Sequence, residues 1–303
     1  MEHVTIWSKG TRIAGNLYRP ATMREGETYP VVVCCHGWGA PLKHVVHDTG
    51  LPDKLAAAGF FVLAFDYRGW GESDGILVAE EPLPQGATEA TLRVRIIREF
   101  CDLAEWLTDI QHAIDFVEGE PGVDRARIGL WGSSLGGGMV IWMAANDPRV
   151  KCVVSQAGAQ DLRGTDYTGE AFFPKWSIAD LSDRAMQQAR NPVYPLPLPA
   201  DSAWLPRQPV DANLRFAHYS AIEWAERVRT PVRFVDAEHE NLWDRHKHSE
   251  ALYHRIKAAR RAPVDYRVIP GIEHIAVYHE AAGAASDLAV EWFTRYLQPA
   301  AAQ

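Results

Sequence analysis

The sequence has few cysteines, no long apolar run and no excess of basic residues. Four of its 303 residues are cysteine and no Cys-x-x-Cys pair occurs, which excludes a disulfide scaffold. We expect these cysteines to be small, reduced, buried side chains of a cytoplasmic protein. No uncharged apolar stretch approaches the roughly 18 residues of a membrane span, and the start MEHVTIWSKG lacks the pattern of a signal peptide. We therefore expect no membrane association.

Basic residues are outnumbered, 31 against 39 acidic ones, and the formal net charge is -8. An acidic surface repels phosphate backbones, so nucleic acid is not an expected partner. Hydrophobic residues make up 47% and charged residues 23% of the chain, close to globular averages. This composition excludes disorder, collagen and coiled coil for the whole chain, and the length is that of one or two domains.

Short β-branched runs alternate with helical patterns along the chain. An apolar stripe predicts a helix over residues 102–118, begun by Asp102, and another predicts a last helix over 286–297, begun by Ser286. Alternating strands and helices predict a mostly parallel α/β sheet, with an antiparallel edge built from the first thirty residues. The buried strands are expected at residues 31–35, 61–65, 128–131, 152–154, 232–235 and 266–269.

Two stretches interrupt this alternation, residues 76–101 and residues 159–227. The second is rich in proline and aromatic residues, whereas a linker would be rich in glycine and serine. We therefore predict an α/β core in two parts, 1–158 and 228–303, with a helical or irregular cap, 159–227, inserted after the sixth strand. Four aromatic side chains of the cap are candidates for substrate contact: Phe172, Phe173, Trp176 and Trp204.

The strongest motif is Gly132-Ser-Ser134-Leu-Gly136, which directly follows a predicted strand and opens a predicted helix. Gly-x-Ser-x-Gly in this context predicts a sharp turn that exposes the hydroxyl of Ser134 beside the positive end of a helix. Ser133 occupies the x position, so its side chain should point away from the cleft.

A second glycine-rich turn, His36-Gly37-Trp38-Gly39, ends an earlier strand. An acyl-transfer intermediate needs two fixed N–H donors for its oxyanion. We assign them to the backbone amides of Leu135 and Trp38. The ring of His36 is expected to bond within its own loop, and Trp38 is either a pocket wall or core packing.

A serine hydroxyl needs a base, and His274 has the expected position, in the loop after the last strand. The acid that orients it should follow the preceding strand. Glu240 fits this position best. The alternatives are Asp236, within the strand end, and Glu238, Asp244 or Asp161.

Together these motifs resemble those of the α/β-hydrolase superfamily. The resemblance is carried by the His-Gly-Trp-Gly turn, the run Phe65-Asp66-Tyr67-Arg68-Gly69-Trp70-Gly71, the Gly-x-Ser-x-Gly turn, and the loops around Glu240 and His274. Within it, the sequence is similar to the branch that groups dienelactone-hydrolase-like esterases with serine peptidase-like hydrolases. The resemblance covers about residues 1–158 and 228–298. It implies an eight-stranded sheet, no metal or organic cofactor, and a triad of Ser134, Glu240 and His274. Dienelactone hydrolases proper use a cysteine where this chain has Ser134.

Other polar clusters have structural explanations. We expect the Asp66–Gly71 segment to be a structural loop in which Arg68 pairs with a carboxylate. His44 and His47, and the acidic and histidine residues of 236–248, lack the helical His-Glu-x-x-His spacing of a zinc site, and we interpret them as solvated loops.

The sequence thus predicts a serine hydrolase of a carboxylic ester or lactone, acting on a small to medium hydrophobic molecule through an acyl-enzyme. The same residues could cleave an amide, a short peptide or a carbon–carbon bond, and a binding protein that has lost catalysis is a third hypothesis. The sequence does not indicate an oligomeric state.

Overall fold

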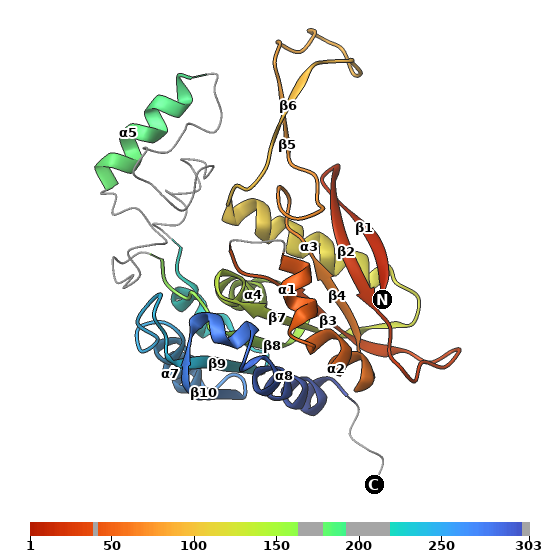
Figure 1. Ribbon diagram of the computed structural model, residues 1–303, viewed down its shortest axis with the longest axis vertical. Coiled ribbons are helices and arrows are strands. Elements are labelled where there is room, and N and C mark those ends of the chain that lie inside the picture. Colours follow the sequence, from red (N-terminus) through yellow and green to blue (C-terminus); the bar gives the residue numbers. More distant parts are fainter. Residues whose placement is uncertain (39–41, 163–177, 192–218, 299–303) are drawn as a thin grey trace.

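The fold is built around one eight-stranded sheet with helices on both faces (Figure 1). This computed structural model describes residues 1–38, 42–162, 178–191 and 219–298. From one edge of the sheet to the other, the strands are β1 (Glu2–Ser8), β2 (Thr11–Tyr18), β4 (Phe61–Phe65), β3 (Tyr29–Cys35), β7 (Val123–Ser133), β8 (Val150–Gln156), β9 (Val232–His239) and β10 (Val264–Glu273).

Strand β2 runs antiparallel to both of its neighbours, and the other pairs in the sheet are parallel. The central strands β3 and β4 are buried almost throughout, as expected for strands covered on both faces. The predicted mostly parallel eight-stranded sheet with an antiparallel edge is confirmed.

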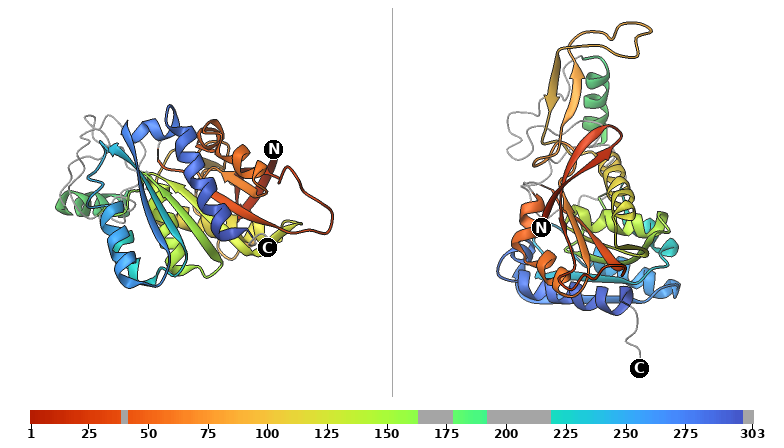
Figure 2. Two further views of the ribbon diagram at one scale, coloured as in Figure 1. Left: turned by 90° about the horizontal axis from the view of Figure 1, so that it is seen from below. Right: turned by 90° about the vertical axis from the view of Figure 1, so that its right-hand side faces the viewer.

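Helices cover the sheet in two layers (Figure 2). One face carries α3 (Leu103–Gly119), α4 (Leu135–Asn146), α7 (Ser249–Ala259) and the short 3-10 helix η1 (Ala221–Arg227). The other carries α1 (Leu42–Asp48), α2 (Leu51–Ala57) and α8 (Ala282–Leu297), of which α2 and α8 contact each other. Successive residues of β3 point to opposite faces, so Val31 and Val33 join one core while Val32 and Cys34 join the other.

The two helix starts that the sequence predicted have different outcomes. Helix α3 begins where expected, because the Asp102 carboxylate accepts hydrogen bonds from the amides of Ala104 (3.0 Å) and Glu105 (3.3 Å). The prediction that Ser286 begins the last helix is wrong, since α8 starts one turn earlier. The Ser286 hydroxyl lies inside the helix and donates to the carbonyl of Thr49 (3.3 Å).

Both interruptions of the strand–helix alternation contain regular structure. Residues 76–101 hold a separate antiparallel pair of strands, β5 (Ile76–Ala79) and β6 (Val94–Ile97), which the sequence did not predict. The second interruption follows β8, the sixth strand of the main sheet along the chain, and includes α5 (Ile178–Ala189) and η1. Buried residues of η1 belong to the core beside α4, so the end of this insert packs on the sheet layer. The division at 159 and 227 stays a prediction.

The carboxyl ends of the parallel strands lie along one edge of the sheet. At this edge β3 leads to the His36–Trp38 turn, β7 to Ser134, β9 to Glu240, and β10 to the 3-10 helix η2 (His274–Tyr278). Ligands of open α/β sheets bind outside this edge. The fold therefore brings together residues that are up to 238 positions apart, His36 and His274.

Candidate active site

Ser134 occupies a strained turn between β7 and α4. Its φ of 55° and ψ of −122° lie outside the ordinary regions for a residue with a side chain. The flanking glycines are required by space, because a Cβ on Gly132 would lie 2.3 Å from the carbonyl oxygen of Gly136 and one on Gly136 would lie 2.2 Å from that of Cys35. The strain and the close packing leave Ser134 partly exposed at the end of the sheet.

The side chains of Ser134, His274 and Glu240 form a continuous row. Nε2 of His274 lies 3.2 Å from Oγ of Ser134, and Nδ1 of His274 lies 2.7 Å from Oε2 of Glu240. The side chains of His274 and Glu240 are only 2% and 1% exposed. A carboxylate can only accept, so the proton of a neutral His274 lies on Nδ1, and Nε2 is free to accept from the serine hydroxyl.

Two further contacts hold this row in place. The second oxygen of Glu240, Oε1, accepts a hydrogen bond from the amide of Leu242 (3.0 Å). The ring of Trp243 meets the imidazole of His274 edge-on, with centroids 4.8 Å apart and planes at 76°. Trp243 is almost fully buried, so it limits the rotation of His274. The sequence reasoning did not identify this residue, because no spacing rule signals a ring contact.

The other carboxylates considered as the acid have different partners. Oδ2 of Asp236 accepts from the hydroxyl of Tyr266 (3.0 Å), and burial raises the pKa of Asp236 to about 7. Glu238 accepts from the amide of Gly271 (2.7 Å). Asp244 accepts from the amide of His246 (3.0 Å), and Asp161 forms an isolated backbone bridge with Ser220. Glu240 is the carboxylate found on the imidazole of His274.

The turn after β3 lies directly against Ser134. A Cβ on Gly37 would be 2.6 Å from the Cβ of Ser134, so glycine is required for this approach. Trp38, the next residue, is partly buried against the core. Leu135 is the first residue of α4, where a backbone N–H has no acceptor within the helix. The two amides predicted as oxyanion donors thus belong to segments that flank Ser134.

His36 has a structural role in this turn, as the sequence indicated. Its Nδ1 donates to the carbonyl of Gly37 (2.7 Å), and its Nε2 accepts from the amide of Tyr67 (3.3 Å). Burial lowers the pKa of His36 to about 4, so the ring is neutral at neutral pH. Both ring nitrogens are used to fix the backbone beside the site.

The Asp66–Gly71 loop is also structural. Arg68 forms a buried ion pair with Asp109 of α3 (Nη2–Oδ1 2.6 Å) and a second pair with Glu105. The Asp66 carboxylate accepts from the amide of Glu72 (3.1 Å). These bonds tie the loop after β4 to α3, and the interpretation from sequence agrees with them.

Ser133, the competing serine, is turned away from the row. Its hydroxyl lies 2.7 Å from that of Tyr278 in η2. Burial raises the pKa of Tyr278 to about 12, so this phenol stays protonated over the ordinary pH range. The bond links the Ser134 turn to the helix that carries His274.

The four aromatic candidates for substrate contact lie outside the described residues: Phe172, Phe173, Trp176 and Trp204. Their assignment to the substrate pocket therefore stays a prediction. Nδ1 of His47 lies 2.9 Å from the hydroxyl of Tyr18. Among the side chains that the structure describes, no three His, Cys, Asp or Glu residues are grouped as metal ligands. In the same part of the chain, no helix is both long and apolar enough to cross a bilayer.

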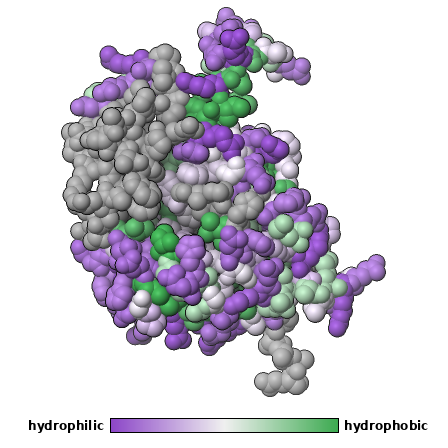
Figure 3. Space-filling model, in the orientation of Figure 1, coloured by the Kyte–Doolittle hydropathy of each residue, from purple (hydrophilic) through white to green (hydrophobic). Residues whose placement is uncertain are grey.

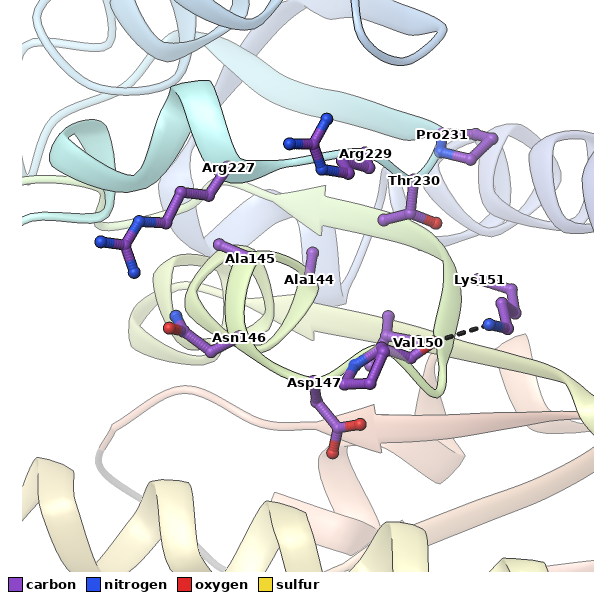
Figure 4. A pocket seen from close by; sticks show the side chains of 11 residues that line it. Ala144, Ala145, Asn146, Asp147, Val150, Lys151, Arg227, Arg229, Thr230 and Pro231 are labelled. Carbon is purple, nitrogen blue, oxygen red and sulfur yellow. Dashed lines mark hydrogen bonds between the residues drawn. The ribbon is translucent and has the colours of Figure 1, made fainter.

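An open cavity of about 490 Å³ lies at the other end of α4, between the helix's last residues, the start of β8 and the segment before β9 (Figure 4). Helix α4 has 12 residues and is about 18 Å long, so this cavity is remote from Ser134. Basic side chains at its rim, Lys151, Arg227 and Arg229, are suited to the negative end of the helix dipole. It does not belong to the row of Ser134, His274 and Glu240.

Known proteins resemble this chain in sequence and in fold. An uncharacterized 31.7 kDa protein of the traX-finO intergenic region of Escherichia coli is 38% identical over 133 residues, 44% of this chain and 38% of that protein. The quorum-quenching protein AidA of Acinetobacter baumannii is 32% identical over 154 residues, 51% of this chain and 42% of AidA. These alignments span about two-fifths of the relatives' own length.

The alpha/beta hydrolase GrgF from a Penicillium species has the same fold, with a TM-score of 0.72 and 17% identity over 98% of both chains. A model of the family described as X-Pro dipeptidyl-peptidase (S15 family) matches residues 9–264, well over half of the sequence. The chain therefore belongs to the X-Pro dipeptidyl-peptidase (S15) family, within the α/β-hydrolase superfamily of serine hydrolases.

Proposed function

We propose that this protein hydrolyses a carboxylic ester or lactone of a small to medium hydrophobic molecule, with Ser134 as nucleophile. The observation that carries the proposal is the continuous row from Ser134 Oγ through the imidazole of His274 to the buried carboxylate of Glu240. A strained, partly exposed serine next to an oriented base is the arrangement that nucleophilic catalysis requires.

The reaction has two halves. Ser134 Oγ attacks the carbonyl carbon while its proton passes to Nε2 of His274, and Glu240 stabilises the resulting imidazolium. The tetrahedral intermediate then collapses, the bond to the leaving oxygen breaks, and His274 gives its proton to the leaving alcohol. Water repeats the sequence on the acyl-enzyme, with His274 as base, and releases the acid and free Ser134.

The negative oxygen of each intermediate needs two donors. We assign these to the backbone amides of Leu135 and Trp38, supported by the position of Leu135 at the start of α4 and by the contact of Gly37 with Ser134. The N-terminal end of the α4 dipole favours the same charge.

The substrate class rests on composition and resemblance. The aromatic residues of the 159–227 segment, including Phe172, Phe173, Trp176 and Trp204, support an apolar pocket formed by a cap over Ser134. The relative AidA is named for quorum quenching, and quorum signals are small molecules. The family description favours a second candidate, cleavage of a short peptide after proline, because the same three side chains can serve both reactions.

A fluorophosphonate probe tests the nucleophile. The wild-type protein should gain one covalent adduct by mass spectrometry, and Ser134→Ala should gain none. Ser133→Ala is the matched control and should still be labelled, because its hydroxyl bonds to Tyr278 instead. Equal labelling of wild type and Ser134→Ala would refute the assignment.

Paired substrates separate the two candidate functions. We expect rapid release of p-nitrophenol from p-nitrophenyl butyrate and much slower release of p-nitroaniline from Ala-Pro-p-nitroanilide. The p-nitrophenolate that leaves the ester is a weaker base than the p-nitroanilide anion, so its departure needs less proton transfer from His274. If the anilide is cleaved with the higher kcat/KM, the peptidase candidate replaces the esterase.

A further inference from the structure

His248, the residue before α7, is buried although other histidines of the same stretch are not. It is 4% exposed, whereas the side chains of His246 and His254 are 62% and 65% exposed. Figure 3 shows a largely hydrophilic surface over α7, at the lower left of the view. The interpretation of residues 236–248 as solvated loops is therefore wrong for His248, and its burial needs a reason.

The ring of His248 is turned away from the helix that it precedes. His248 is the N-cap residue of α7, but its side chain makes no capping hydrogen bond, and the usual N-cap residues are Ser, Thr, Asp and Asn. Its Nδ1 instead accepts from the backbone amides of Gln160 (3.1 Å) and Asp161 (3.5 Å). The ring thus connects the start of α7 to the segment that follows β8.

This segment is itself fixed to the Ser134 turn. The amide of Ala159 donates to the carbonyl of Ser134 (2.9 Å). The side-chain amide of Gln160 donates to the hydroxyl of Ser155 in β8 (2.8 Å), and Gln160 is fully buried. Residues 159–161 therefore give the ring of His248 a rigid anchor that belongs to the sheet and to the backbone of the nucleophile.

The ring of His248 also supports Trp243. The two rings are stacked, with centroids 5.6 Å apart and planes at 18°. The same indole meets the imidazole of His274 edge-on at 4.8 Å. Trp243 thus contacts two histidines, the proposed base and a second one that is anchored to the backbone.

These contacts close a circuit around the site. It runs from Ser134 through residues 159–161 to His248, through Trp243 to His274, and back across the 3.2 Å between Nε2 and Oγ. The position of the base relative to the nucleophile is therefore set by more than their own hydrogen bond. A misplacement of about 1 Å can cost about a hundredfold in rate. Removing the ring of His248 would open the circuit at Trp243.

We propose that His248 is a positioning residue for the reaction of Ser134. Held by the two backbone amides after β8, its ring keeps Trp243 against the imidazole of His274. His248 acts through Trp243 and exchanges no proton in the reaction. This proposal rests on the hydrolytic function proposed above.

The variant His248→Asn separates positioning from stability. The asparagine oxygen can accept from the amide of Gln160 in place of Nδ1, and asparagine is a favourable N-cap for α7, so the melting temperature should stay that of the wild type. The ring is lost, however, so kcat for p-nitrophenyl butyrate should fall about 10- to 100-fold with little change in KM. His246→Ala removes an exposed histidine of the same stretch, and this matched control should keep the wild-type kcat.

A double-mutant cycle tests whether His248 acts through Trp243. Trp243→Leu alone should lower kcat, because His274 loses its edge contact. If the two residues act as a unit, adding His248→Asn to Trp243→Leu should lower kcat by less than a further threefold or so. All rates are measured well below the melting temperature of each variant, so that a loss of stability does not enter kcat.

The outcomes distinguish this proposal from the proposed function. If the wild type hydrolyses the ester and His248→Asn keeps its kcat, the ring contact is not needed and the positioning proposal is wrong, while the hydrolytic function stands. A loss in KM alone, or a full additional loss in the Trp243→Leu background, also overturns it. A wild type that neither hydrolyses the ester nor reacts with the fluorophosphonate refutes the proposed function and this proposal with it.

Discussion

Replacing Glu240 by glutamine isolates the contribution of one buried charge to the proposed reaction. The substitution keeps the size of the side chain and the acceptor for the Leu242 amide. It removes the negative charge 2.7 Å from Nδ1 of His274 and can present an NH₂ group there instead. An amide donor at Nδ1 would move the imidazole proton to Nε2, and Nε2 could then no longer accept the proton of Ser134.

The size of the loss follows from the geometry. When Ser134 gives up its proton, an imidazolium forms next to the carboxylate, and both side chains are almost fully buried. Two opposite unit charges about 4 Å apart attract by about 4 kcal/mol at an effective dielectric constant of about 20. That energy corresponds to about a thousandfold in rate, and the wrong tautomer raises the expected loss toward about 10⁴-fold.

The assay is the steady-state hydrolysis of p-nitrophenyl butyrate. Glu240→Gln should lower kcat by about 10³- to 10⁴-fold with little change in KM, because the lost interaction forms only in the transition state. Asp236→Asn is the matched control, a second buried carboxylate of the same strand end, and should change kcat by less than about tenfold. A larger loss in Asp236→Asn than in Glu240→Gln would refute the assignment of the acid.

Three further predictions test the surroundings of the row. Gly37→Ala should lower kcat about 100-fold, because its Cβ would meet that of Ser134 at 2.6 Å and displace it, and the melting temperature serves as control. Burial lowers the pKa of His36 from its ordinary value of 6.5 to about 4, so the stability that the neutral ring contributes above pH 6.5 is lost as the pH falls. The unfolding free energy of the wild type, measured with urea, should therefore fall by about 3 kcal/mol between pH 6.5 and pH 4. His36→Asn should show a correspondingly flatter pH profile. Asp109→Ala should destabilise the protein by about 3 kcal/mol, because the buried Arg68 loses its main partner. The double variant Arg68→Met/Asp109→Leu should recover part of this loss. An unchanged urea midpoint in Asp109→Ala would contradict this account.

The Ser134 turn could be predicted because the residues next to it in the sequence meet its steric requirements. A glycine on each side of the serine, an apolar strand before and a helix after leave few other structures, and both glycine contacts are below the distances that real Cβ atoms tolerate. The position of His274 could be predicted for a similar reason, since the chain order of strands fixes which loop follows the last one.

The sequence placed Glu240 first among the acids but left its neighbours open. Asp236, Glu238 and Glu240 lie within five residues at the end of β9, where the strand ends and the backbone leaves the sheet. Which carboxylate reaches His274 depends on the path of this loop relative to η2, and neither periodicity nor propensity encodes that path. The strand pair β5–β6 was missed for a different reason: its strands have only four residues each, too few for an alternation to be recognised, and the segment between them contains two prolines.

The end of β9 carries two buried carboxylates, and burying both of them in the charged form would cost free energy. Asp236 is buried beneath the row, and the charge of Glu240 adds to the desolvation that raises the pKa of Asp236 to about 7. Glu240, in contrast, accepts hydrogen bonds from the amide of Leu242 and from Nδ1 of His274. Because its pKa is raised to about 7, Asp236 is in part protonated near neutral pH. Its carboxylate accepts from Tyr266, so Glu240 is the acid of this strand end that contacts the imidazole of His274.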